Sequence, residues 1–289
     1  MQTQVTMLNS MASPDFTEAL DRHVEWGLKL LDLRDAIYGK KLIDLTIDEA
    51  ENAAVEIANR DLQTHCLSSP LFVGTVEDGR AAFKQNHLAP LDHLLQIARI
   101  FRPKKIRLLA AETSRRSQID NAVTYVREAH PWLFDLYSQA IERIDEAGFH
   151  TTIENELGGC IFSTPEEVRD FFSLLDTQKA SFTWDVQNLW QMGTFPSGEA
   201  YEILRPFIGY IHLKGGKAEA DQHESVWASS LEDASWPVDE ILRRIVSDGI
   251  SPVICLNSAH GKKPEGYDMR TVAQRDLAYV NRIIREVQE

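Results

Sequence analysis

Three short apolar segments in the second half of the chain each end in a side chain that can bind a metal ion. The segments cover residues 151–156, 182–188 and 208–214, and the ligand-type residues are Glu154, Asp185 and His212. β-Branched and aromatic residues predict β-strands here, and helix-like stretches separate them. Carboxylates that lie close together repel each other unless a cation sits between them. If the strands bring these side chains together, the sequence predicts a divalent-metal site.

Each candidate ligand has a polar partner two residues further along: Glu156, Gln187 and Lys214. Because residues two apart on a strand face the same way, we expect each partner to point toward the same site. The set of oxygens and one imidazole suits Mn, Mg, Co, Fe or Zn and does not choose among them. One such side chain is more often a structural hydrogen-bonding group. Three in order at three consecutive strand ends favour a shared site.

The elements that must position these residues alternate along the whole chain. Strands are predicted at residues 5–9, 27–33, 62–67, 106–110, 151–156, 182–188, 208–214 and 252–256. Helices are predicted at residues 13–26, 48–59, 78–101, 127–147, 237–246 and 270–287, and Ser163-Thr-Pro-Glu-Glu opens another. This order predicts a single α/β domain over residues 1–289, a (β/α)8 TIM barrel whose strands end at one mouth. A doubly wound sheet is the less favoured alternative, because no Gly-rich dinucleotide fingerprint follows a predicted strand.

Composition narrows the class of protein. The net charge of -14 and the pI near 5.1 argue against a nucleic-acid partner, since phosphate binding needs clustered Lys and Arg. No apolar run reaches the length of a membrane span, and the first residues lack the features of a signal peptide. Cys66, Cys160 and Cys255 are far apart, so we expect reduced core thiols. A cytoplasmic enzyme without a membrane partner is the expectation.

Four stretches of the chain carry a family resemblance. They are Ile153-Glu-Asn-Glu, Thr183-Trp-Asp-Val-Gln-Asn-Leu-Trp-Gln-Met-Gly, Tyr210-Ile-His-Leu-Lys-Gly and Pro252-Val-Ile-Cys-Leu-Asn. The sequence resembles the xylose-isomerase-like TIM barrels of the sugar phosphate isomerase/epimerase superfamily. The similarity covers essentially the whole chain in order, and its last 140 or so residues are the most specific part.

The resemblance implies one divalent metal ion and a set of site residues. Members hold the ion with a Glu, an Asp, a His and a second Glu, which correspond here to Glu154, Asp185, His212 and, in the last place, Asn257. Asp32 stands where many members carry an acid. The implied catalytic residues are Glu154, for proton transfer, and Lys214. The candidate substrate-binding residues are His65, Glu156, Gln187, Asn188, Trp190 and His260.

The resemblance also implies a reaction, and the departures from it leave alternatives open. The favoured function is an isomerase or epimerase that acts on a small sugar or polyhydroxylated keto compound through proton transfer next to a carbonyl. Asn257 cannot take a proton near neutral pH, although its carbonyl oxygen can bind a metal. A dehydratase, which needs one base and one acid, tolerates that loss. A barrel that only binds polyols is the third alternative. Residues 217–233 are predicted to form a lid or a homo-oligomer contact.

Overall fold

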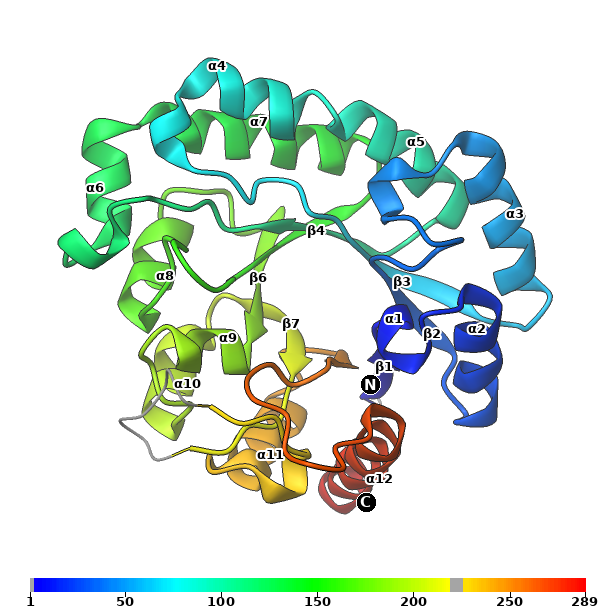
Figure 1. The fold of residues 1–289 in the computed structure, drawn as a ribbon. Coiled ribbons are helices and arrows are strands. Elements are labelled where there is room, and N and C mark those ends of the chain that lie inside the picture. The colour runs from blue at the N-terminus through cyan, green and yellow to red at the C-terminus, as the bar shows by residue number, and fades with distance from the viewer. Residues whose placement is uncertain (1–2, 219–225) are drawn as a thin grey trace.

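The chain forms eight β-strands that curl into a barrel (Figure 1). They are β1 (Gln4–Met7), β2 (Leu30–Leu33), β3 (Gln63–Ser68), β4 (Lys105–Leu109), β5 (His150–Glu154), β6 (Ala180–Asp185), β7 (Ile208–Leu213) and β8 (Val253–Leu256). The computed structural model describes residues 3–218 and 226–289. Neighbouring strands pair in parallel in the order β1-β8-β7-β6-β5-β4-β3-β2, and a bridge from Leu8 to Asp32 joins the two edges. The predicted (β/α)8 barrel is confirmed, and the doubly wound alternative is wrong.

Helices surround the barrel and cover its outer face. They are α1 (Asn9–Ala12), α2 (Phe16–Glu25), α3 (Ile47–Ala58), α4 (Arg80–Phe83), α5 (Leu91–Phe101), α6 (Ala122–Ala129), α7 (Trp132–Glu146), α8 (Pro165–Phe172), α9 (Val186–Gln191), α10 (Gly198–Leu204), α11 (Val238–Asp248) and α12 (Met269–Gln288). Short turns of 3₁₀-helix are η1 (Leu42–Asp44), η2 (Val76–Asp78), η4 (Arg116–Gln118) and η6 (Leu231–Asp233), and η3 (Lys84–Leu88) is a π-helical turn. Among the described residues, no helix has both the length and the apolar character needed to cross a membrane.

Helix starts follow the capping signals in the sequence. The predicted start near Pro165 is confirmed, because the Thr164 side chain accepts a hydrogen bond from Glu167 N and Pro165 occupies the first turn of α8. Helix α3 begins with a reciprocal pair in which Thr46 and Glu49 each bond the other's backbone N–H.

Two long predicted helices are wrong, because proline divides each of them. The helix predicted at 127–147 is two helices, α6 and α7, with Pro131 between them. The helix predicted at 78–101 is divided into η2, α4, η3 and α5, and α5 begins after Pro90. Proline has no N–H to donate, and its ring clashes with the preceding turn of a helix.

The ends of β5 and β6 also differ from the prediction. Strand β5 ends at Glu154 and β6 at Asp185. The Asp185 side chain accepts a hydrogen bond from Asn188 N, so the carboxylate caps α9 and converts the chain from strand to helix. Gln187 and Asn188 therefore lie on a helix, and the predicted strand alternation does not apply to them.

Apolar packing between the sheet and the helices holds the strand ends in place. Phe162 and Phe182 contact each other edge-on at a ring-centroid distance of 6.2 Å, and Phe162 lies 4.7 Å from Phe171 of α8. Trp184 faces outward and lies 6.5 Å from Tyr201 of α10. These contacts fix the outer face of β6, whose last residue is Asp185.

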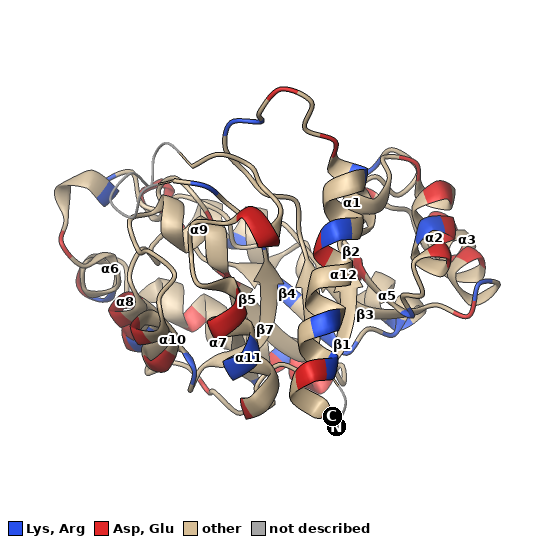
Figure 2. Cartoon of the chain, turned by 90° about the horizontal axis from the view of Figure 1, so that it is seen from below, with Lys and Arg blue, Asp and Glu red and all other residues tan. Residues whose placement is uncertain are grey.

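Both chain termini lie at the lower edge of Figure 2, at the amino ends of the strands. The carboxyl ends of the strands form the opposite rim. Two segments extend that rim: Lys217 pairs antiparallel with Trp227, and Trp227 pairs with Lys262. The predicted lid at 217–233 is described only in part, since residues 219–225 lie outside the described residues.

Candidate metal centre

Glu154, Asp185 and His212 lie at the carboxyl ends of the adjacent strands β5, β6 and β7. Each offers one ligand atom, and the three atoms lie within 4.8 Å of one another. The side chains are almost completely buried, with exposed fractions of 1% or less. The structure thus brings together three side chains that are 27 or more residues apart in the sequence.

Asp32, at the end of β2, holds the other side of the His212 ring. Its Oδ2 atom lies 3.2 Å from His212 Nε2 and accepts a hydrogen bond of 2.9 Å from Tyr210 Oη. Ser68 Oγ donates to the second oxygen at 2.5 Å. With Nε2 held by Asp32, His212 directs Nδ1 toward Glu154 Oε1, 2.6 Å away. A carboxylate behind an imidazole is the arrangement that orients metal-binding histidines.

Hydrogen bonds that involve the main chain fix Asp185, and they do not use its carboxylate oxygen Oδ2. Asn155 holds the Asp185 backbone through two hydrogen bonds of 2.9 Å, one to the N–H and one to the carbonyl. Asp185 Oδ1 accepts from Asn188 N at 3.1 Å. The remaining atom, Oδ2, lies 2.6 Å from Lys214 Nζ, which also donates to Asn188 Oδ1 at 3.2 Å.

Arg107 of β4 is a member of the centre that the sequence analysis missed. Its Nη1 forms an ion pair with Glu154 Oε2, and its Nη2 donates to Ser69 O at 3.0 Å. The side chain is 4% exposed. The available signal was an arginine between the apolar residues Ile106 and Leu108 of β4. A charge at such a position needs a buried partner.

The acids and cations of the centre shift one another's pKa. Burial alone would raise the pKa of Glu154, but the charges of His212 and Arg107 hold it well below its usual range. Burial alone would lower the pKa of His212, but Glu154 and the hydrogen bond to Asp32 raise it well above its usual value. Burial raises the pKa of Asp185 in spite of the neighbouring Lys214. The centre pairs three acids with three cations, namely Asp32, Glu154 and Asp185 with Arg107, His212 and Lys214.

A divalent cation fits the donor atoms that are present. Asp185 Oδ2 and His212 Nδ1 are buried, and neither has a directed hydrogen bond among the described residues; their 2.6 Å neighbours are ion-pair contacts. Buried polar atoms without a hydrogen bond are rare in folded proteins. Together with Glu154 they form the mixed oxygen and nitrogen set that divalent metals bind.

A second group of possible ligands, Asp32, His212 and Cys255, shares the histidine. Burial and the nearby Asp32 raise the pKa of Cys255 to about 11, so the thiol keeps its proton near neutral pH. The thiol donates to Leu256 O at 3.5 Å, and we assign no ligand role to Cys255. Cys66 and Cys160 are also buried free thiols.

Asn257 follows β8 and is 4% exposed. Its backbone N–H donates to Leu213 O at 3.1 Å, which ties the end of β8 to β7. Its side-chain Oδ1 accepts from Ser258 N at 2.8 Å. An amide oxygen has two lone pairs, so one stays available to a ligand.

The loop after β8 is held by Gln187. The Gln187 amide donates to His260 O at 3.1 Å and accepts from His260 N at 2.5 Å, and its side chain is fully buried. Gln187 therefore positions His260. The charge of Lys214, together with burial, lowers the pKa of the His260 imidazole to about 3, so the ring is neutral near pH 7.

Glu156 and Asn188, both predicted substrate contacts, lie beside the ligands. Asn188 donates to Asn155 O at 3.1 Å, accepts from Lys214 and is 1% exposed, so it joins two loops of the rim. Glu156 lies beyond the end of β5 and is only partly buried. Burial and the charge of Glu154 raise the pKa of Glu156.

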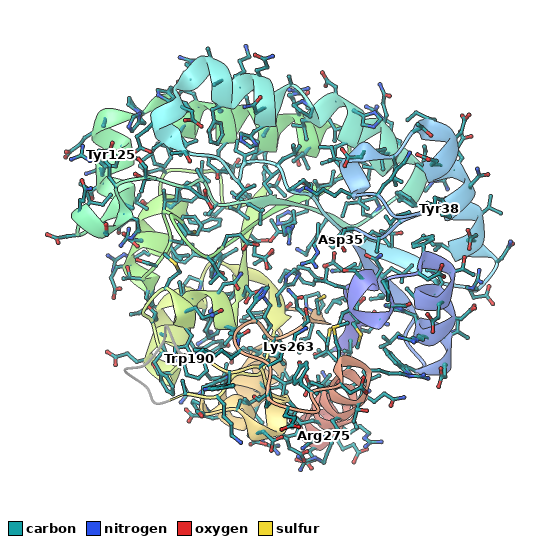
Figure 3. All side chains as sticks on the ribbon, viewed as in Figure 1. Asp35, Tyr38, Tyr125, Trp190, Lys263 and Arg275 are labelled. Atoms are coloured by element: carbon teal, nitrogen blue, oxygen red, sulfur yellow. The ribbon has the colours of Figure 1, made fainter. Side chains whose placement is uncertain are left out.

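Trp190 and His65 lie outside the centre. Trp190 is fully buried and contacts Phe195 edge-on at 5.3 Å, away from the barrel axis (Figure 3). His65 was predicted as a substrate contact on the strand at 62–67, but β3 continues to Ser68. His65 is the third residue of β3 and lines a cavity at the amino ends of the strands. We leave both residues out of the proposed substrate site.

Solved structures with the same architecture cover nearly the whole chain. A xylose isomerase-like TIM barrel protein from Mycobacterium smegmatis in complex with magnesium is 15% identical, covers 100% of this chain and 98% of its own, and gives a TM-score of 0.72. The probable 3-DHS dehydratase of Bacillus anthracis is 13% identical, covers 96% of this chain and 98% of its own, and gives a TM-score of 0.72. A D-psicose 3-epimerase from Clostridium cellulolyticum, crystallised with D-tagatose, is 12% identical. It covers 98% of this chain and 99% of its own, and gives a TM-score of 0.71.

This chain has the xylose-isomerase-like barrel fold. The fold implied by the sequence resemblance is therefore confirmed. No protein-family model and no curated protein matches the chain by sequence.

Proposed function

We propose that the chain is a divalent-metal-dependent isomerase or epimerase of a small sugar or polyhydroxylated keto compound. The observation that carries the proposal is the buried triad of Glu154, Asp185 and His212 at the strand ends, where barrel enzymes of this fold have their chemistry. The proteins of the same fold include an epimerase crystallised with a ketose and a barrel holding magnesium, and these support the substrate class and the ion.

Glu154, Asp185 and His212 would hold the ion, with Asn257 Oδ1 as a fourth donor. When bound, a divalent ion polarises a carbonyl and acidifies the neighbouring C–H. The ligand set is compatible with Mn, Mg, Co, Fe or Zn. Asp32 keeps His212 in the orientation that this role needs.

Two carboxyl groups are available for proton transfer. Glu154 borders the reacting position, but Arg107 and His212 keep its pKa low, which favours a ligand role. Glu156 has a raised pKa and lies partly exposed at the rim, so it exchanges a proton more readily near neutral pH. We therefore assign proton transfer to the pair, with Glu156 as the group that exchanges with solvent.

Lys214 is the cation best placed to act on the substrate. Its Nζ makes one contact with Asp185 and one with Asn188, so an ammonium has one further N–H to donate. A donor fixed in a buried site stabilises negative charge as it develops on a substrate oxygen. Arg107 contacts Glu154 through Nη1 and Ser69 through Nη2, so it supports the carboxylate of Glu154 instead.

The test is solvent exchange in D₂O. The protein, loaded in turn with Mn²⁺, Mg²⁺ or Co²⁺, is incubated with D-psicose, D-tagatose, D-fructose or L-ribulose, and NMR follows deuterium uptake next to the carbonyl. We expect metal-dependent uptake with formation of an epimer or isomer, and loss of both in Glu154→Gln and Asp185→Asn. Glu51→Gln, an exposed acid on α3, is the matched control that keeps activity.

The other outcomes decide between the alternatives. Loss of water with a new enone absorbance supports a dehydratase, for which Asn257 in place of a second carboxylate is the favouring observation. Metal and ketose binding without exchange supports a barrel that only binds polyols. Failure of the purified protein to take up any ion contradicts the proposal.

A further inference from the structure

A cavity lies at the opposite end of the barrel from the candidate metal centre. It has a volume of about 870 Å³ and is bordered by the first residues of β1, β2, β3 and β8 and by the carboxyl-terminal parts of α3 and α5. Small-molecule sites in proteins are roughly 300–1,000 Å³. The cavity is therefore large enough for a ligand of its own, and nothing in the proposed reaction uses it.

The wall of this cavity is apolar on one side and cationic on the other. Ile57 of α3 and Phe101 of α5 contribute to the apolar side. Arg102 and Lys104 form the cationic edge, and no Asp or Glu lines the cavity. Among the described residues, neither cation forms an ion pair within 4.0 Å. In a chain with a net charge of -14, two unpaired cations and no acid around one cavity favour an anionic ligand.

His65 supplies a buried polar atom without a partner. The side chain is 6% exposed and lines the cavity, and its Nε2 has no hydrogen bond among the described residues. Its ring is held against Tyr210 at a centroid distance of 5.2 Å. Burial and the nearby Lys105 lower the pKa of His65 to about 4, so the ring is neutral and can donate one N–H to a ligand.

Lys105 adds a further positive charge behind His65. It is partly buried at the start of β4, and its Nζ lies 3.6 Å from the position that a Cβ on Gly209 of β7 would take. Burial lowers its pKa, and Cys66 offsets that effect only in part. A partly desolvated ammonium without an acid partner is costly, and a bound anion would reduce that cost.

We propose that this cavity binds a small amphipathic carboxylate. The carboxylate would lie at the edge formed by Arg102, Lys104 and His65, and its apolar body would lie between α3 and α5. The site is separate from the metal centre, so the proposal does not depend on the proposed function.

The test uses hexanoate as the probe, titrated by ligand-observed NMR or calorimetry. Hexanamide is the uncharged analogue, and acetate lacks the apolar body. We expect hexanoate to bind about tenfold more tightly than either, and its affinity to fall as salt rises, because salt screens exposed charges. The double variant Arg102→Gln/Lys104→Gln should lose about tenfold in affinity, as should His65→Leu.

Two further variants locate the site. Ala58→Phe adds bulk to the wall without changing any charge and should abolish hexanoate binding. Arg127→Gln removes an exposed cation on α6 and should leave binding unchanged. Circular dichroism and Mn²⁺ titration check that each variant is folded and has an intact metal centre. Equal binding of hexanoate and hexanamide, or equal losses in Arg127→Gln and the double variant, would overturn the proposal.

Discussion

Replacement of Arg107 by methionine tests the charge balance of the metal centre. The guanidinium is buried beside Glu154, whose other oxygen lies 2.6 Å from His212 Nδ1. Arg107→Met keeps the unbranched apolar stem of the side chain but removes its charge. The three acids of the centre then face two cations, His212 and Lys214. Removing one partner of a buried ion pair costs about 3–5 kcal/mol. Because His212 still neutralises Glu154, we expect a loss of about 3 kcal/mol, at the lower end of that range.

The sign of the pH dependence follows from Glu154. Its pKa is lowered in the folded chain, so its ion pairs stabilise the fold above the unfolded-state pKa, and this contribution disappears as the pH falls. Arg107→Met removes part of that contribution. The difference in unfolding free energy between wild type and variant should therefore be largest near pH 7, begin to shrink near about pH 4, where glutamate in the unfolded chain takes up a proton, and disappear only at lower pH.

The assay is urea denaturation with a chelator present, so that metal binding does not contribute to stability. A second variant, Arg107→Met/Glu154→Gln, removes both charges. We expect the double variant to be more stable than the sum of the single losses implies, with a coupling of about 1–3 kcal/mol. Additive losses, or a loss for Arg107→Met that does not change with pH, would refute the assigned ion pair.

Three other outcomes follow from the same contacts. Asp32→Asn weakens the support of His212, and we expect metal affinity to fall about 10–100-fold in a calorimetric titration, with no fall for Asp35→Asn. Metal uptake should release a proton and strengthen as the pH rises from 6 to 8. The reason is that the pKa of His212 is raised, so a proton must leave the ring before it binds a metal ion. Calorimetric titration in buffers of different ionisation enthalpy measures that proton release. Gly216→Ala places a Cβ 2.9 Å from the Trp190 ring and 3.0 Å from Gln187 Nε2, so hydrogen exchange in the loop after β8 should speed up, whereas Gly39→Ala should not change it.

The strand order and the meeting of Glu154, Asp185 and His212 at one rim were predictable because they depend on local patterns. Apolar β-branched segments give strands, and a parallel barrel brings their carboxyl ends to one rim whatever the loops between them. Glu154, Asp185 and His212 follow from that rule alone. The breaks in the two long helices were also readable from the sequence, because Pro90 and Pro131 lie inside the predicted ranges and proline interrupts a helix.

The contacts that orient the ligands could not be read from the sequence. Arg107 belongs to the centre only because β4 pairs with β5 in the register that sets Leu109 beside Glu154. Gln187 bonds the backbone of His260 because Asp185 caps α9 and changes the backbone from strand to helix. His65 lies toward the amino end of the barrel because it is the third residue of β3, which runs on to Ser68. Each of these depends on pairing between distant segments.

The most direct test of the central claim is a crystal grown with Mn²⁺ and measured at the manganese absorption edge. We expect one strong anomalous peak within bonding distance of Glu154, Asp185 Oδ2 and His212 Nδ1, and no such peak in crystals of Asp185→Asn. Manganese bound at another place in the barrel, or none bound beside these three side chains in the wild type, would contradict it.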